Sequence, residues 1–283
     1  MVRWTDGANG ANEADPGAVV PENRRFGARL PIVPASTADG WAWVVAAVLG
    51  YLLGEVSSVL LISVVAGATG HSHDLSQMLR QPVLPLWVEV TGFVGLWPGF
   101  LGAAFIARRR WGTGRVVSHT GLLIRRSDVL YGGIVGVAAQ LVLLPLLYLP
   151  LRPFVHNLVQ QLGGPARQLT GGSGIDAVIT GILTVAVVPV IEEVFFRGLL
   201  LRGLLRMFAG AGERLGPALA VLISGLLFGA AHAEGLQFIG LAGIGIVLSL
   251  LAYRTGRLGP SIFAHAAFNL VAVIATSNVG VLH

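Results

Sequence analysis

Seven apolar runs, most of them about 20 residues long, dominate the chain and decide what it can fold into. Of its 283 residues, 54% are hydrophobic and 12% are charged, and the mean hydropathy is +0.75. A water-soluble domain of this size has no core large enough for so much apolar surface, whereas such runs match the hydrocarbon thickness of a bilayer. The sequence therefore predicts an all-α, polytopic bundle of transmembrane helices. The predicted spans are residues 41–66, 86–107, 129–150, 174–207, 216–233, 236–253 and 259–278.

The fourth run, 174–207, is longer than one crossing of the membrane requires. At about 1.5 Å per residue, a helix of this length exceeds a hydrocarbon core of about 30 Å. One interpretation is a single helix with a cytoplasmic extension, kinked by Pro189. The other is that the run hides a re-entrant piece or an additional span. We therefore expect about seven spans, with eight as the alternative.

The basic residues, all of which are arginine, are distributed unevenly over the connections between the spans. The connections after the second, fourth and sixth spans carry Arg108, Arg109, Arg110, Arg115, Arg125, Arg126, Arg202, Arg206, Arg214, Arg254 and Arg257. The opposite connections carry only Arg80, Arg152 and Arg167. By the positive-inside rule, the N-terminus is cytoplasmic and the C-terminus lies outside. The net charge of +5 thus reflects membrane orientation and does not indicate a nucleic-acid partner.

The chain divides into three regions. Residues 1–40 are polar, rich in Gly, Ala and Pro, and without a sustained period, which predicts a mobile cytoplasmic tail. Residues 41–173 supply transmembrane helices without a recognised motif, and 174–283 contain the motifs described below. The absence of cysteine excludes disulfides and thiolate chemistry. Basic residues that are all arginine indicate a GC-rich genome, so we expect an integral protein of a bacterial cytoplasmic membrane.

Two adjacent acids, Glu192 and Glu193, lie in the middle of the fourth apolar run, followed by Arg197. An unpartnered carboxylate costs several kcal/mol to hold away from water. Neighbours on a helix point about 100° apart, so the two acids cannot face the same way. Glu193 and Arg197 are four residues apart and can form an ion pair within the helix. Glu192 must find its partner on another helix, unless the pair marks a helix end that reaches the membrane surface.

Two further polar pairs occur in the last apolar segments, each at helical spacing. Phe228 and His232 are four residues apart, and so are His265 and Asn269. A single intramembrane histidine is commonly a hydrogen-bonded core residue. Together with Glu192, however, these groups supply a carboxylate, two imidazoles and an amide from three segments. Convergence on one polar cavity avoids separate desolvation penalties, so the spacing predicts a shared site.

The patterns EEVFFR, FGAAH and HAAFN, in this order, resemble those of the CAAX protease and bacteriocin-processing family of intramembrane endopeptidases. That family is known for EExxxR, FxxxH and HxxxN, and the resemblance covers residues 174–278. It implies that Glu192 is the general base that activates a water and that His232 helps to hold this water. It also implies that His265 and Asn269 stabilise the tetrahedral oxyanion. Glu193, Arg197 and Phe228 are then structural support.

The family resemblance leaves the metal requirement open. A divalent ion such as Zn²⁺ has a candidate ligand set in Glu192, His232 and His265. If His265 serves the oxyanion, however, only two of the usual three protein ligands remain, so we favour a metal-free mechanism.

The sequence restricts the substrate only by class. The eukaryotic branch of the family cleaves prenylated C-terminal tails, which a bacterial protein would rarely meet, so we expect a membrane-associated peptide or protein. The alternative function is a non-catalytic membrane scaffold or bacteriocin-immunity-type protein that retains the fold. A transporter would require interrupted helices in both halves, and the N-terminal half has no matching break. Glu89, near the start of the second span, either lines a cavity or, as we expect, is paired or interfacial.

Overall fold

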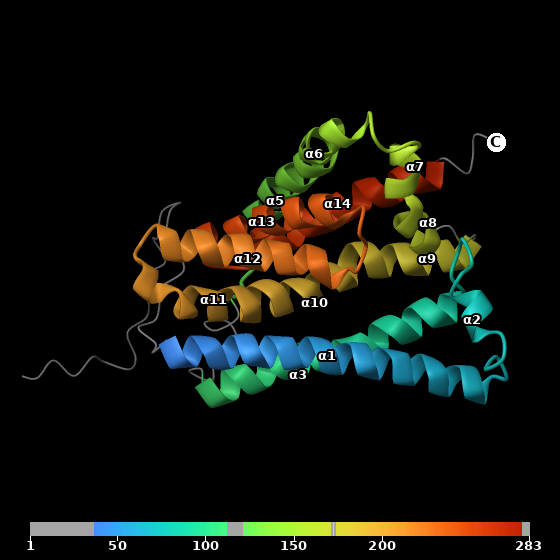
Figure 1. The fold of residues 1–283 in the computed structure, drawn as a ribbon, viewed down its shortest axis with the longest axis horizontal. Coiled ribbons are helices and arrows are strands. Elements are labelled where there is room, and N and C mark those ends of the chain that lie inside the picture. Colours follow the sequence, from blue (N-terminus) through green and yellow to red (C-terminus); the bar gives the residue numbers. More distant parts are fainter. Residues whose placement is uncertain (1–36, 112–120, 171, 173, 279–283) are drawn as a thin grey trace, which may run out of the picture.

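The structure is a computed structural model that describes residues 37–111, 121–170, 172 and 174–278. Within these ranges the chain forms helices and no β-strand (Figure 1). The predicted all-α class is therefore confirmed. Most of the predicted N-terminal tail, residues 1–36, lies outside the described residues.

The first two long helices form an antiparallel hairpin (Figure 1). Helix α1 spans Thr37–Ala68 and α3 spans Leu86–Trp111, with the short helix α2, Leu75–Met78, between them. The two long helices approach closely because their contact is built from glycine. A methyl group added at Gly99 would collide with the backbone of Gly50 and Gly54. Small residues allow such close backbone contact between membrane helices.

A second long helical stretch contains a local widening. Helix α5, Arg126–Ala138, continues through a π-helical turn, Ala139–Leu143, into α6, Leu144–Tyr148, and a 3₁₀ turn, Leu149–Leu151. Pro145 lacks an N–H group and follows directly after the π turn. Two short helices, α7 at Leu158–Leu162 and α8 at Gly164–Thr170, then lead to the centre of the bundle.

The overlong fourth segment is one continuous helical stretch from Gly174 to Met207. It comprises α9, Gly174–Ile182, α10, Val188–Phe195, and α11, Leu201–Met207. Two π-helical turns, Leu183–Val187 and Phe196–Leu200, separate these parts. The re-entrant alternative is therefore not found in this segment. The first π-helical turn, Leu183–Val187, ends two residues before Pro189, where the sequence predicts a kink.

Three more helices complete the bundle. Helix α12 spans Leu215–Ala231 after a 3₁₀ turn at Ala209–Ala211, α13 spans Phe238–Thr255 and α14 spans Gly259–Asn278. Six helical stretches of the described chain are long and apolar enough to cross a membrane. The seventh predicted span corresponds to α12, an apolar helix of 17 residues that is shorter than the others. The structure thus supports a polytopic membrane protein, while the count of seven stays a prediction.

We call the continuous stretch Gly174–Met207 the central helix. The core lies where the α1–α3 hairpin meets this helix and α12. Phe100 of α3 stacks on Phe195 with ring centroids 4.0 Å apart. Phe196 meets Phe228 of α12 edge to face at 5.1 Å. These aromatic contacts fix the rotation of the central helix directly beside its acidic pair.

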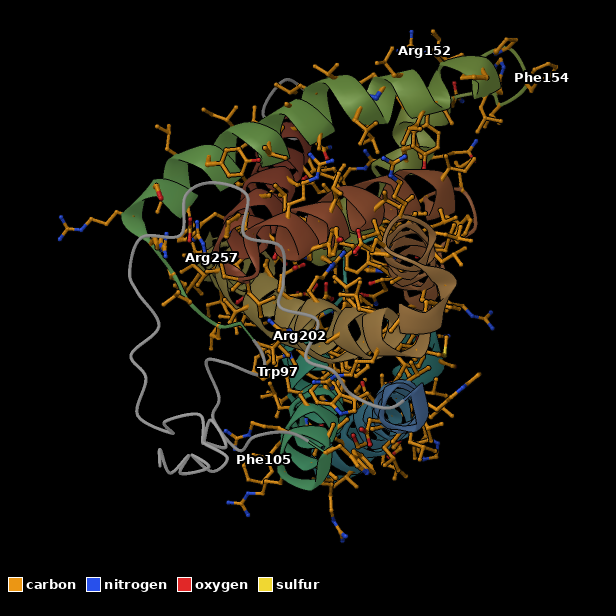
Figure 2. All side chains as sticks on the ribbon, turned by 90° about the vertical axis from the view of Figure 1, so that its left-hand side faces the viewer. Trp97, Phe105, Arg152, Phe154, Arg202 and Arg257 are labelled. Atoms are coloured by element: carbon orange, nitrogen blue, oxygen red, sulfur yellow. The ribbon has the colours of Figure 1, made fainter. Side chains whose placement is uncertain are left out.

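The arginines of the described residues collect at one end of the bundle. The ends of α3, α11 and α13 and the starts of α5, α12 and α14 meet on the left of Figure 1. In Figure 2 this end faces the viewer, with Arg202 and Arg257 labelled. Arg257 pairs here with Asp128 of α5. Arg152 and Arg167 belong to the opposite end, with α7 and α8. The folded bundle therefore preserves the charge asymmetry of the sequence.

Candidate active site in the transmembrane bundle

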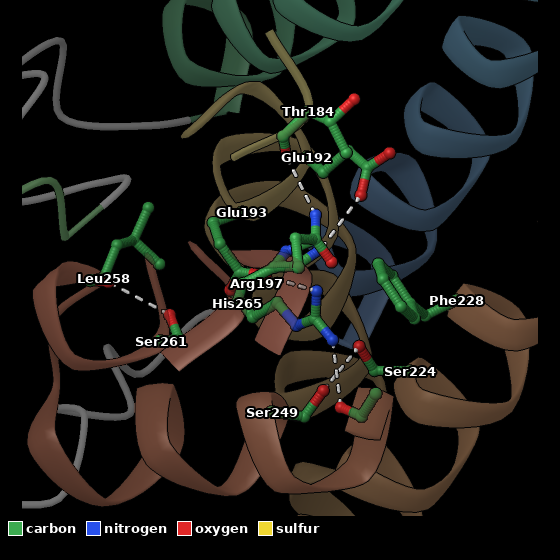
Figure 3. Close-up of polar contacts among 12 residues, drawn as sticks. Thr184, Glu192, Glu193, Arg197, Ser224, Phe228, Ser249, Leu258, Ser261 and His265 are labelled. Atoms are coloured by element: carbon green, nitrogen blue, oxygen red, sulfur yellow. Dashed lines mark hydrogen bonds and ion pairs between the residues drawn. The ribbon is translucent and has the colours of Figure 1, made fainter. Parts of the chain in front are cut away.

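The predicted ion pair between Glu193 and Arg197 is present and fully enclosed. Arg197 Nη1 lies 2.7 Å from Glu193 Oε1, and both side chains have no exposed surface. Arg197 Nη2 also donates a hydrogen bond of 3.0 Å to the Gly245 carbonyl of α13 (Figure 3). The guanidinium lies 4.5 Å from the centroid of the Phe228 ring, a cation–π arrangement. We call Glu193, Arg197 and Gly245 the closed polar cluster.

His265 lies between the two acids. Its Nδ1 is 3.2 Å from Glu193 Oε1, and its Nε2 is 3.7 Å from Glu192 Oε2 (Figure 3). The first distance is a hydrogen bond, whereas the second is longer than one. A carboxylate only accepts, so Nδ1 carries the proton and donates to Glu193. Glu193 thereby fixes the ring with Nε2 facing Glu192.

Glu192 differs from its neighbour in having no such partner. Its side chain is 15% exposed, and Oε2 is buried without a hydrogen-bond partner among the described residues. The nearest imidazole with a measured contact belongs to His265, whereas the family resemblance pairs Glu192 with His232. A carboxylate that is largely enclosed but lines a cavity and has an oxygen without a hydrogen bond remains available to a water or a substrate.

His232 is held at the C-terminal end of α12. Its Nδ1 lies 2.8 Å from the Phe228 carbonyl one turn earlier. A carbonyl only accepts, so Nδ1 is the donor and Nε2 stays free to accept a proton or a hydrogen bond. The Phe228 ring contacts the rings of both His232 and His265, at centroid distances of 4.8 and 5.5 Å. Phe228 therefore orients both imidazoles.

Asn269 is oriented by the π-helical turn of the central helix. Its Nδ2 donates a hydrogen bond of 2.9 Å to the Thr184 carbonyl. Within that turn the Val188 N–H bonds the Leu183 carbonyl five residues earlier. The next donor in this pattern would belong to Pro189, which has no N–H group, so the Thr184 carbonyl is left for Asn269. One amide proton of Asn269 remains for another acceptor.

All four predicted catalytic side chains line one cavity of about 320 Å³, which we call the central cavity. This volume lies at the lower end of the range of about 300 to 1,000 Å³ typical of ligand sites. Glu192, His232, His265 and Asn269 come from three different helical segments, as the sequence predicts. Their convergence is an observation of the structure, whereas their catalytic roles stay predictions.

The central cavity also contains residues that the sequence analysis missed. Gln140 lies in the π-helical turn of the α5–α6 stretch, and its buried Oε1 has no hydrogen-bond partner among the described residues. Tyr148 donates to the Leu236 carbonyl at 2.8 Å and accepts from the Gly240 N–H at 3.1 Å. The signal was a glutamine and a tyrosine within an otherwise apolar span. The N-terminal region thus contributes to the site.

The alternative metal site finds no support in the arrangement of the described side chains. Throughout those residues, no group of three or more His, Cys, Asp or Glu side chains is placed to hold a metal ion. Glu192, His232 and His265 all line the cavity, but they do not form such a group. We therefore derive no step through a metal.

Glu89 was expected to pair or to sit at the interface. It is instead buried in α3, and neither carboxylate oxygen has a hydrogen-bond partner within the described part of the chain. It does not belong to the lining of the central cavity. Pairing of Glu89 therefore finds no support among the described residues, while its position at the membrane interface stays a prediction.

The cavity geometry and the three motifs can now be compared with known proteins. Residues 174–271 match the family of Rce1-like type II CAAX prenyl endopeptidases. The resemblance predicted from the motifs is thereby confirmed over this region. No curated protein and no solved structure matches the chain.

The Rce1-like region carries all three motifs but not the whole cavity. The matched family is one of CAAX prenyl endopeptidases, that is, of proteases. Glu192, His232, His265 and Asn269 fall within the matched residues. Phe93, Gln140 and Tyr148 line the same cavity from outside them. The N-terminal helices therefore complete a cavity whose motif residues lie in the Rce1-like region.

Proposed function

We propose that this protein is an intramembrane endopeptidase in which Glu192 activates a water for attack on a peptide bond. The observation that carries the proposal is the convergence of Glu192, His232, His265 and Asn269 on one cavity inside an apolar bundle. Amide hydrolysis needs a base within reach of water and donors aimed at the developing oxyanion. The lining of this cavity contains both kinds of group.

The base and its assistant act first in this mechanism. Glu192 takes a proton from the attacking water, because its Oε2 has no competing hydrogen bond in the described structure. His232 holds the same water through Nε2, since its Nδ1 is engaged by the Phe228 carbonyl. The proton on Glu192 then passes to the leaving amine, as general acid–base catalysis requires.

The oxyanion is stabilised from α14. His265 in its imidazolium form donates through Nε2, while Nδ1 remains on Glu193. Glu193 compensates the positive charge of the ring. Asn269 donates its second amide proton, the first being held by Thr184. Donors fixed in this way need little reorganisation when charge develops.

We also propose seven spans, with the N-terminus in the cytoplasm. Helix α12, with 17 residues, is about 25 Å long and needs only about 5 Å of adjoining residues or bilayer thinning. The clustering of arginine at one end of the bundle supports the orientation. The end that carries α7, α8 and the α12–α13 connection then faces outside.

A panel of membrane-associated peptides incubated with wild type and Glu192→Ala tests the proposed activity. We expect cleavage by the wild type and a loss of at least about 10²-fold in the variant. Thermal unfolding in detergent serves as the control for folding. Equal cleavage by both proteins rules out this mechanism, and absence of cleavage across the panel would favour a non-catalytic scaffold.

A further inference from the structure

The central cavity has a deep end and a shallow end. Phe228, Ile244 and His265 are buried and form its floor. Glu234, in the connection between α12 and α13, is exposed and lies at its rim. Helix α8 adds Pro165 to the same rim, partly exposed like its neighbours. The cavity thus opens towards the end of the bundle that carries α7, α8 and the α12–α13 connection (Figure 1).

This open end is opposite to the arginine-rich end. Arg202, Arg214 and Arg254 belong to helix ends on the other side of the bundle. At the open end the described arginines are Arg80, Arg152 and Arg167. Arg167 donates to the Gln160 carbonyl beside it. Arginine-rich connections lie on the cytoplasmic side of membrane proteins. The floor of the cavity therefore points to the cytoplasm, and its mouth points away from it.

The lining of the cavity also restricts the ligand. Its described lining residues include the carboxylates Glu192 and Glu234, but no arginine. Most of the remaining wall is apolar, with the amides of Gln140 and Gln237 between. A free C-terminal carboxylate bound close to Glu192 would meet like charge, and the nearby His265 is already paired with Glu193. An uncharged segment with an internal peptide bond meets no such penalty, and the amides match its backbone.

We propose that the site takes an apolar polypeptide segment that reaches the membrane from the non-cytoplasmic side and cleaves an internal bond. Exported or membrane-inserted polypeptides form this class. The cleavage rests on the proposed function, whereas the direction of access rests on the proposed orientation alone. The rim is therefore accessible from outside the cell even in a protein without activity.

Single cysteines in this cysteine-free chain test the direction of access. Gly235 lies at the rim, Gly164 begins α8, and Gly210 lies at the arginine-rich end. A side chain at each of the three meets no atom within 4 Å, so cysteine is tolerated. In intact cells, an impermeant maleimide should label Gly235→Cys and Gly164→Cys at once. Gly210→Cys should be labelled only after permeabilisation, and the reverse pattern, or equal labelling of all three, overturns the proposal.

A matched pair of substrates tests the proposed substrate class. A single-span protein carries the same apolar segment on its outer side in one version and on its cytoplasmic side in the other. We expect cleavage of the outer version only, and only with Glu192 intact. Cleavage of the cytoplasmic version alone contradicts the inference. If neither version is cut while the rim is labelled from outside, the proposed protease function fails and the direction of access stands.

A second pair of peptides tests whether a free C-terminal carboxylate disfavours cleavage. One peptide ends as a free acid three residues beyond the scissile bond, and the other continues as an uncharged segment. We expect the extended peptide to be cleaved at least several-fold faster at limiting substrate. A preference for the free acid would overturn the part of the inference that rests on the lining of the cavity.

Discussion

The closed polar cluster and the wall of the central cavity lie side by side but use their polar groups in opposite ways. In the cluster, Glu193 binds both Arg197 and His265 without any exposed surface. In the wall, Glu192 is one residue away, and its side chain is 15% exposed. One oxygen of each acid is buried without a hydrogen-bond partner among the described residues, but of the two acids only Glu192 lines the cavity, where a water or a substrate can meet it. The comparison predicts separable effects on activity and on stability.

The largest effect on turnover is expected at the wall. Glu192→Gln keeps the shape of the side chain and removes the base, so kcat should fall by about 10² to 10⁴. The unfolding midpoint should stay close to that of the wild type, since this carboxylate stabilises little. Both quantities are measured on the same purified protein. Full activity of the variant would remove the protease hypothesis.

Asn269 tests the oxyanion side of the wall. Asn269→Ala removes an amide donor, and the loss of one such donor costs about 10² to 10³ in kcat. It also leaves the Thr184 carbonyl without the 2.9 Å hydrogen bond that replaces the missing Pro189 donor. KM should change less than kcat, because the donor acts on charge that develops in the transition state. A change in KM alone would indicate that Asn269 only binds substrate.

The closed polar cluster should respond chiefly in stability. Glu193→Gln leaves Arg197 buried without its counter-ion, which costs about 3 to 5 kcal/mol of unfolding free energy. Activity per folded molecule should fall less than in Glu192→Gln, although His265 loses its ionic partner. Replacing the pair together, with Glu193→Leu and Arg197→Met, should restore part of the stability. Equal losses of specific activity in the two glutamine variants would mean that this division of labour is wrong.

The smallest effect is expected where the N-terminal region meets the Rce1-like region. Tyr148→Phe leaves the Leu236 carbonyl and the Gly240 N–H without their shared hydroxyl. The cost should be about 1 to 3 kcal/mol of unfolding free energy. Tyr131→Phe, on the exposed side of α5, is the matched control and should change the unfolding midpoint little. An unchanged midpoint in Tyr148→Phe would show that the α6 contact is dispensable.

Much of the bundle could be predicted from the sequence because membrane burial leaves a strong, repeated signal. The predicted span 86–107 lies within Leu86–Trp111, and 236–253 is close to Phe238–Thr255. The ion pair of Glu193 with Arg197 could equally be predicted, since it depends only on spacing within one helix. The three motifs identified four residues of the cavity lining without any knowledge of how the helices pack.

The rest of the site depends on packing between helices, which spacing does not encode. His265 lies between both acids because α14 packs on the central helix, so its contact with Glu193 could not be anticipated. Gln140 and Tyr148 signal polarity in their span, but their spacing does not indicate which neighbouring helix they face. The π-helical turns were missed because the hydrophobic period assumes 3.6 residues per turn.

Because of the two π-helical turns, the side chains of the central helix do not keep one regular angular spacing along its whole length. Each π-helical turn inserts about one residue into a regular helix, so the residues after it are displaced by about 100° around the axis. Ile175 and Val178, before the first wide turn, are exposed on the outside of the bundle, while the acids after it point inward. Removing one residue from Leu183–Val187 would change which neighbour of the acidic pair faces the cavity. The orientation of the active carboxylate is thus set by a residue count that a deletion can alter while every motif letter stays the same.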